Sequence, residues 1–390
     1  MHRSSKRNVR SHSRTGGEIA ESFFKPLIRI LTAIFASLIL IAQNSPALTG
    51  SSQKTFSREA MLHNIGGNVL VAGYENLAKR CRELTNAVGQ LAQTTNQSSL
   101  DHARKTWLAT ADAANRMRCF QTGPIADRGY LSTFYYWQVL PMRIEGATEA
   151  ANSFEQSFID ELGATTKGLF TIEYLIFDRS TNQPAQGAKA GTALELLSAS
   201  LARGAFLQAV ARDLETKAGL VASDWNASGD QSVFSKFVAA GHESVNLLVN
   251  QLAMITEDTA EKHLNFVLVL PTPIAQQLYR VERSRSGSSL QGLLATLEGF
   301  EKIYRGGDGF GLDDAISRVN PSLQKRLGEQ FASAFAAMRA LGGPLEQAVV
   351  DKRILLEKAY EQVRALEILF KVDVVSALGV TLTFSSADGD

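Results

Sequence analysis

Apolar residues recur along most of this chain at the three- and four-residue spacing of amphipathic helices. In VLVAGYENLAKRCRELTNAVGQLA, for example, Val71, Leu77, Leu84, Val88 and Leu91 fall near one helical face. Only 9 prolines occur among 390 residues, so few helices should be interrupted. The same spacing predicts further helices over 103–120, 194–225, 233–256, 288–304, 321–341 and 345–369. We therefore expect an all-α chain of bundled helices rather than alternating strands and helices.

The length of the chain and a weak internal similarity suggest two domains. A chain of 390 residues is long enough for two domains of ordinary size. The similar segments are VAGYENLAKRCREL from Val71 with AAGHESVNLLVNQL from Ala239, and WLATAD from Trp107 with LLATLE from Leu293. Chance matches arise easily in helices rich in Ala and Leu, so internal duplication is a hypothesis. We predict two related helical bundles packed side by side, residues 48–225 and 226–390, with a site in the crevice between them.

The N-terminal region has the pattern of a secretory signal. Seven basic residues precede residue 30, and they are followed by the 13-residue apolar run ILTAIFASLILIA and by QNSPA. Small Ser45 and Ala47 have the spacing that a signal peptidase accepts. We predict a signal peptide over residues 1–47 and a mature, periplasmic chain that begins near Leu48. The alternative is an inner-membrane anchor, but an uncleaved span would need about 20 apolar residues.

The overall charge gives little indication of a strongly charged partner. Lys and Arg number 40 and Asp and Glu number 39, a formal net charge of +1. A chain without a basic surplus does not have the electrostatic character of a nucleic-acid-binding protein. We expect no nucleic-acid partner, and membrane contact only through the signal segment.

The chain contains two cysteines, Cys81 and Cys119. An exported protein could join them in a disulfide. If they lie on antiparallel helices joined by the polar turn near Asn96, however, their positions are staggered by roughly 10 Å along the helix axis. This stagger argues against the bond.

Well-known catalytic motifs are not recognisable in the sequence. No Ser/His/Asp arrangement, phosphate-binding loop or HExxH zinc motif can be identified. His63, His102, His242 and His263 are isolated from one another. His242 is followed by Glu243, but neighbouring residues on a helix point about 100° apart and do not form a chelate by themselves.

One acidic residue stands out in the apolar stretch KGLFTIEYLIFD, which begins at Lys167. Glu173 follows Leu169 and Phe170 by about one helical turn, so its neighbours on a helix are apolar. A buried carboxylate needs a partner, a metal or a raised pKa, because desolvation of the charge is costly. A structural salt bridge with an arginine and a functional role are both open.

A polar segment, ERSRSGSSL, begins at Glu282 and leads into a predicted helix. It contains Arg285, Ser286 and Ser289. Serine hydroxyls before a helix usually cap its amide groups, and the same position can bind an anion. Capping is the favoured interpretation, and ligand binding is the alternative.

Several segments, taken in order, resemble the imelysin family of bacterial envelope proteins. These segments are WLATADAANRMRCFQTGPI, GLFTIEYLIFD, RGAFLQAVARDLETKAGLVASDW, RSRSGSSLQGLLATLEGF and TLTFSSADGD. The resemblance implies two helical domains with a site at their interface, built around a GxHxxE motif. It also implies a link to iron uptake, and founding members of the family are described as metallopeptidases.

The family motif is incomplete in this chain. Gly168 matches the motif glycine and Glu173 the motif glutamate, whereas Phe170 occupies the position of the histidine. A His and a Glu three residues apart on a helix can hold one cation, but Phe has no lone pair to donate. Glu173 is then the only metal ligand that the motif provides. A WPD-type segment of some family members also differs here and reads Trp137-Gln138-Val139.

These patterns lead to one principal functional hypothesis and two alternatives. The first is an exported imelysin-like binding protein without peptidase activity, linked to the acquisition of iron or another divalent metal. The expected ligand-binding residues are Gly168, Phe170, Glu173, Arg285, Ser286 and Ser289. An imelysin-type metallopeptidase is the first alternative, and it would need His242 or His263 to complete a site with Glu173. A scaffold protein that binds an envelope partner and no small ligand is the second.

Overall fold

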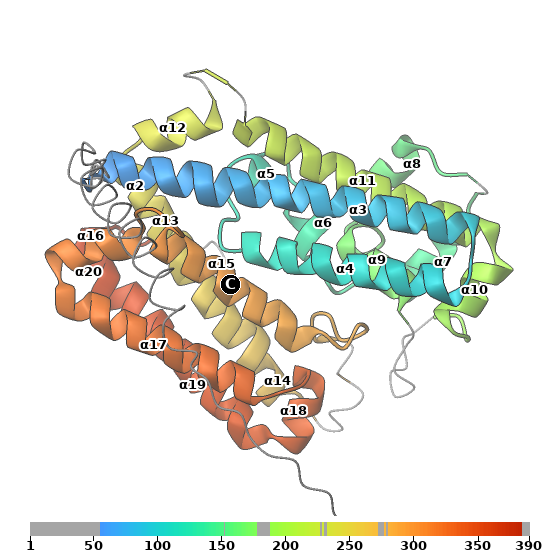
Figure 1. The fold of residues 1–390 in the computed structure, drawn as a ribbon. Helices are drawn as coiled ribbons and strands as arrows, with labels where there is room; N and C mark the ends of the chain where they lie inside the picture. Colours follow the sequence, from blue (N-terminus) through green and yellow to red (C-terminus); the bar gives the residue numbers. More distant parts are fainter. Residues whose placement is uncertain are drawn as a thin grey trace, which may run out of the picture. The chain divides into compact units, whose positions relative to one another are not determined.

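The structure is a computed structural model, and it describes residues 55–151, 153–177, 188–226, 228–229, 232–271, 277 and 280–383. The predicted signal peptide, 1–47, lies outside these residues. The chain from Phe56 onward forms one compact unit (Figure 1). Within the described ranges the regular structure is helical throughout, without a β-strand, so the all-α prediction is confirmed. None of the described helices is both long enough and apolar enough to cross a bilayer.

The first half of the chain contains three long helices and several short ones. In order they are α2 (Arg58–Asn64), the π-helix η1 (Ile65–Val71), α3 (Ala72–Gln93), α4 (Gln97–Met117), α5 (Pro124–Asp127), α6 (Leu131–Tyr135), α7 (Pro141–Glu149), α8 (Gln156–Glu161), α9 (Leu169–Ile176), α10 (Ala193–Ala199) and α11 (Leu201–Asn226). Helix α3 packs along both α4 and α11, and the short α9 contacts α4 and α11 (Figure 1).

The second half is arranged around the paired helices α17 and α19. Its elements are α12 (Val233–Ala239), α13 (His242–Glu257), the π-helix η2 (Asp258–Asn265), α14 (Phe266–Leu268), α15 (Ser289–Arg305), α16 (Leu312–Val319), α17 (Pro321–Ala340), α18 (Leu345–Asp351), α19 (Arg353–Ile368), the π-helix η5 (Leu369–Val374) and α20 (Val375–Leu378). Helix α15 packs against α4 of the first half.

Three segments predicted as single helices are each divided in two. The segment 194–225 is interrupted at Ser200, where the backbone is extended. The segment 233–256 is interrupted at Gly241, whose φ of 58° lies in the left-handed region that favours glycine. The segment 345–369 is interrupted at Lys352. Hydrophobic spacing located these three helical segments correctly, but it continued across the breaks and did not reveal them. It also did not predict the short helices between Pro124 and Ile176.

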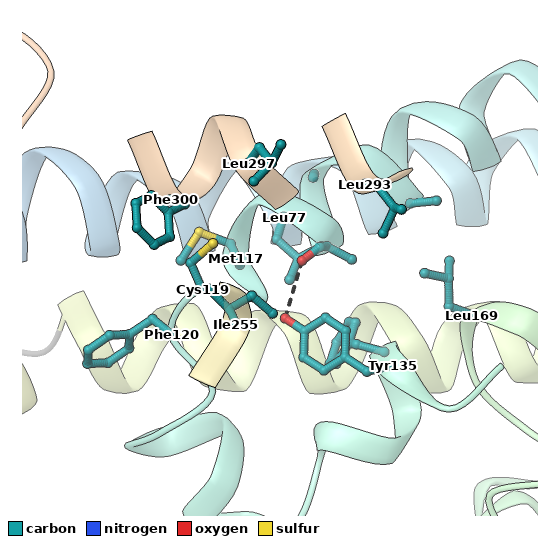
Figure 2. Close-up of a cluster of buried hydrophobic side chains, with 14 of the residues drawn as sticks. Leu77, Met117, Cys119, Phe120, Tyr135, Leu169, Ile255, Leu293, Leu297 and Phe300 are labelled. Atoms are coloured by element: carbon teal, nitrogen blue, oxygen red, sulfur yellow. Dashed lines mark hydrogen bonds between the residues drawn. The ribbon is translucent and has the colours of Figure 1, made fainter. Parts of the chain in front are cut away.

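The hydrophobic core is continuous between the two halves. Figure 2 shows Leu293, Leu297 and Phe300 of α15 on the same cluster as Leu77 of α3 and Ile255 of α13. The division into bundles 48–225 and 226–390, and the internal duplication, therefore remain predictions, because side chains from both halves share one core.

The two cysteines are free and buried. The thiol of Cys119 donates a hydrogen bond to the carbonyl oxygen of Thr296, at 3.1 Å. Burial raises the pKa of both thiols well above the usual range. Both side chains therefore act as small core residues and not as reactive thiolates.

Candidate functional site

Helix α9 carries the segment that matches the family motif, and it is buried along its whole length. Gly168 precedes the helix with φ of 91°. A Cβ atom at this position would lie 2.5 Å from the carbonyl oxygen of Thr133. Only glycine combines this backbone conformation with such a close approach. The motif glycine is therefore required by the entry of the chain into α9.

Phe170 is a core residue. Its side chain is 2% exposed and its ring lies edge-on to that of Trp107, with 6.3 Å between the ring centroids. The indole nitrogen of Trp107 donates a hydrogen bond to the carbonyl oxygen of Leu169, at 2.8 Å. The place of the motif histidine is thus taken by an aromatic contact that ties α9 to α4.

Glu173 is buried and bound by the polar segment of the second half. Its side chain is 1% exposed, and Oε1 accepts a hydrogen bond from the backbone amide of Ser286, at 2.9 Å. Burial raises the pKa of this carboxyl group, while nearby Arg285, the bond with Ser286 and Arg283 partly offset the increase. Among the described residues no salt bridge to Glu173 is formed, so a hydrogen bond from the backbone amide of Ser286 takes the place of the structural salt bridge considered above.

Arg283 fixes the segment that carries Ser286. Its φ is 60°, an uncommon conformation for a residue with a side chain. The guanidinium donates a hydrogen bond from Nη1 to Asp112 Oδ1 of α4 at 2.8 Å, and from Nε to Ser288 Oγ at 2.9 Å. It also lies over the ring of Trp107, 5.7 Å from the centroid. The polar segment is therefore held to α4, close to Phe170 and Glu173.

Ser289 joins α15 to α18. Its hydroxyl donates a hydrogen bond to Glu346 Oε2 at 2.6 Å and accepts one from the backbone amide of Leu345 at 2.8 Å. Ser288, the residue before α15, makes no side-chain capping bond. The predicted capping of α15 by these serines is wrong. The hydroxyl of Ser288 is bound by Arg283 and Ser286 of the same segment, and that of Ser289 binds α18.

Glu346 gives a testable pH dependence of stability. Burial raises its pKa to about 7, an effect reduced by the bond from Ser289 and increased by the charge of Glu173. An unfolded Glu has a pKa near 4.5, so the folded state binds more protons between about pH 4.5 and pH 7. The contribution of Glu346 to stability should therefore fall as the pH rises through this range and stay level above it.

The variant Glu346→Gln should remove this part of the pH dependence. At pH 8 we expect the variant to be more stable, with a free energy of unfolding roughly 2 kcal/mol above that of the parent protein, because no carboxylate is left to desolvate. At pH 4.5 the two proteins should be nearly equal. Urea unfolding at both pH values measures the difference, with exposed Glu361→Gln as the control. An equal difference at both pH values would contradict the assignment.

A second polar cluster lies beside this region. Arg118 Nη1 donates to Glu282 Oε2 at 2.5 Å, and His263 Nε2 lies 3.6 Å from the same oxygen. Burial lowers the pKa of His263 to about 4. A cavity of about 10 Å³ borders the cluster, enough for about one water molecule.

The two histidines considered as completing ligands are engaged elsewhere. His263 faces Glu282, and the imidazole of His242 lies 3.3 Å from the carbonyl oxygen of Gly379. No group of three or more His, Cys, Asp and Glu side chains in the described part of the chain could hold a metal ion. Arg283 and Arg285 add positive charge near Glu173. The residues around the motif do not fit a metal site.

The structure brings together most of the residues expected at the site. Glu173 accepts a hydrogen bond from Ser286, and Arg285 lies over the ring of the neighbouring Tyr174. Ser289 bonds Glu346, whose carboxyl group interacts electrostatically with Glu173. Sequence reasoning missed Glu346, Arg283 and Asp112. Nothing in the helical pattern of 345–369 marked Glu346 as a residue of this region, because its relevance depends on the docking of α18.

Comparisons with known proteins point to one family. A family model described as Imelysin matches residues 70–370. Iron-regulated protein A of Synechococcus elongatus is 24% identical over 304 residues, 73% of this chain and 76% of that protein. A solved structure described as an iron-regulated protein A precursor, from Parabacteroides distasonis, superposes with a TM-score of 0.68 at 17% identity, covering 86% of this chain and 99% of the other. An imelysin-like protein from Psychrobacter arcticum gives 0.66 at 17% identity, with coverage of 85% and 99%.

Proposed function

Because this chain belongs to the imelysin family, we propose that it is an exported, iron-related binding protein of the cell envelope without peptidase activity. The relation to iron is supported by the names of the proteins it resembles. Export is supported by the signal pattern over residues 1–47. The absence of peptidase activity is an inference from the chemistry of the motif segment.

The observation that carries the proposal is the packing of Phe170. A metallopeptidase needs a metal with an open coordination position and a route for substrate. Here the histidine position holds a buried phenyl ring against Trp107, and the motif carboxylate is bound by the amide of Ser286. We therefore place the iron-related role in recognition of an organic or protein partner, and not in binding of a bare metal ion by Glu173.

Metal titration tests this proposal. The mature protein, residues 48–390, should show no saturable binding of Fe²⁺ or Zn²⁺ that depends on Glu173, and no peptidase activity in the presence of either ion. The reason is that Glu173 is a single ligand, already hydrogen-bonded and close to two arginines. Calorimetry of the parent protein, Glu173→Gln and the exposed control Glu361→Gln provides the measurement.

The variant Phe170→His tests whether the fold can still hold a metal ion once the motif histidine is restored. A zinc affinity gained in Phe170→His and lost again in Phe170→His/Glu173→Gln would show that the fold still positions both motif ligands. Tight binding by the parent protein that disappears in Glu173→Gln would overturn the proposal and restore the metallopeptidase alternative.

A second candidate function is supported by the closed packing around Phe170 and Glu173. Both side chains are almost fully buried, and the cavity beside the neighbouring Glu282 is only about 10 Å³. This arrangement favours a scaffold that binds an envelope protein over its surface and takes no small ligand at the motif. In that case Glu173→Gln should leave partner binding unchanged, whereas a site that uses the carboxylate should lose its ligand.

A further inference from the structure

A pocket of about 120 Å³ lies between α3, α4 and α15, away from the motif. Glu173 contacts Ser286 just before α15 begins, whereas Gly299, Lys302 and Ile303 line the pocket from the last two turns of that helix. Because a helix rises about 1.5 Å per residue, the two regions are separated by roughly 20 Å along α15.

The walls of the pocket are apolar. They are formed by Val69 and Leu70 of η1, Met117 of α4, Phe120 and Ile303. Figure 2 shows Met117 and Phe120 among the side chains of the shared core. An apolar cavity of about 150 Å³ can hold a benzene molecule, so this pocket has room for roughly five carbon atoms.

Two backbone features shape the helices that border the pocket: two glycines that let neighbouring atoms approach closely, and a π-helical turn. Gly73 and Gly299 line the pocket, and a Cβ atom would lie 2.2 Å from Met117 Sδ at the first position and 2.0 Å from the Arg116 carbonyl oxygen at the second. In addition, the helix that precedes Gly73 is a π-helix over Ile65–Val71. π-helical turns are rare and frequently occur at functional sites.

The rim of the pocket is polar and carries one uncompensated positive charge. Arg116 is paired with Glu298 at 2.8 Å. Lys302 and Asn76, in contrast, are exposed, and neither forms a side-chain hydrogen bond or ion pair with any described residue. Their ammonium and amide groups are thus available to a ligand whose apolar part occupies the pocket.

We propose that this pocket binds a small amphipathic carboxylate, with an apolar tail of roughly five carbon atoms between Met117 and Phe120. The carboxylate group would lie at the rim, where Lys302 supplies the charge and Asn76 a hydrogen-bond donor. The site is independent of the proposed function of the motif region. Two kinds of ligand combine an apolar tail with a carboxylate group: a free short-chain carboxylic acid, and the C-terminal residue of a peptide when that residue is apolar.

Methionine methyl signals give a site-specific test. In the mature protein labelled with ¹³C-methyl methionine, hexanoate should shift the signal of Met117 and leave that of exposed Met142 unchanged. Burial of a tail of this length corresponds to a dissociation constant on the order of 1 mM. The acetylated dipeptide Ac-Gly-Leu, titrated in parallel, tests whether the ligand is the C-terminus of a peptide. A lower dissociation constant for Ac-Gly-Leu than for hexanoate would identify a peptide as the ligand.

Matched variants separate the charge from the apolar pocket. Lys302→Ala should weaken hexanoate binding about two- to fivefold, the range of an exposed ion pair, and leave binding of uncharged 1-hexanol unchanged. Lys358→Ala, at an exposed lysine on α19, should change neither. Ala72→Phe, an exposed position that lines the pocket, should weaken both ligands because it blocks the opening.

Each outcome is decisive for the proposal. A Met117 shift that depends on Lys302 and on Ala72 supports it. Equal affinity of the parent protein for hexanoate and 1-hexanol would overturn the role of the charge. The site itself would be overturned if the Met117 signal did not shift with any of the ligands at 10-fold the expected dissociation constant, on the order of 10 mM. Failure here leaves the metal titrations of Glu173 unaffected, so the two proposals fail separately.

Discussion

Replacing Arg118 with Met is expected to lower the free energy of unfolding by about 3–5 kcal/mol. The change removes the guanidinium that bonds Glu282 at 2.5 Å and leaves a buried carboxylate behind. In the parent protein the neighbouring His263 does not supply this charge at neutral pH, because burial lowers its pKa to about 4. Urea unfolding at pH 7 measures the loss.

Two controls distinguish the cost of an unpaired charge from a loss of packing. In Arg118→Met/Glu282→Leu no charge is left unpaired, so most of the lost stability should return. The neighbouring Arg116 is 43% exposed in its pair with Glu298, and Arg116→Met should cost less than about 1 kcal/mol. If the double variant were as unstable as Arg118→Met, the loss would come from packing and the argument from charge would be wrong.

Gly168→Ala is expected to destabilise the protein by about 3–5 kcal/mol, because it combines two costs. An alanine would have to adopt φ of 91°, and its Cβ would lie 2.5 Å from the Thr133 carbonyl oxygen. Relief of the contact would shift α9, and with it Phe170 and Glu173. Thermal or urea unfolding measures the effect, and near-ultraviolet circular dichroism reports the environment of Trp107, which packs on α9.

Gly146→Ala is the matched control for this substitution. Gly146 lies within α7, and a Cβ atom there would meet no other atom within 4 Å. Alanine should stabilise this helix by about 0.5–1 kcal/mol. Equal effects of Gly146→Ala and Gly168→Ala would show that the conformation before α9 is not a constraint.

The sequence predicted much of the candidate site, but not its chemistry. Glu173 could be identified because an acidic residue among apolar neighbours is unusual, and Ser286 because of the polar segment around it. The hydrogen bond between them joins residues 113 positions apart, which no local pattern encodes. For the same reason Glu346, whose pKa is raised to about 7, could not be recognised.

The sequence by itself determined the helical class of the fold, since the spacing of apolar residues selects the helix and the face that it buries. It also determined that Phe170 cannot supply a metal ligand, because that property belongs to the side chain alone. Only the tertiary structure decided where the helices break, that Ser289 binds α18, and that both halves share one core. Those features depend on contacts between residues far apart in the chain, whose free energies exceed local preferences only after the helices have packed together.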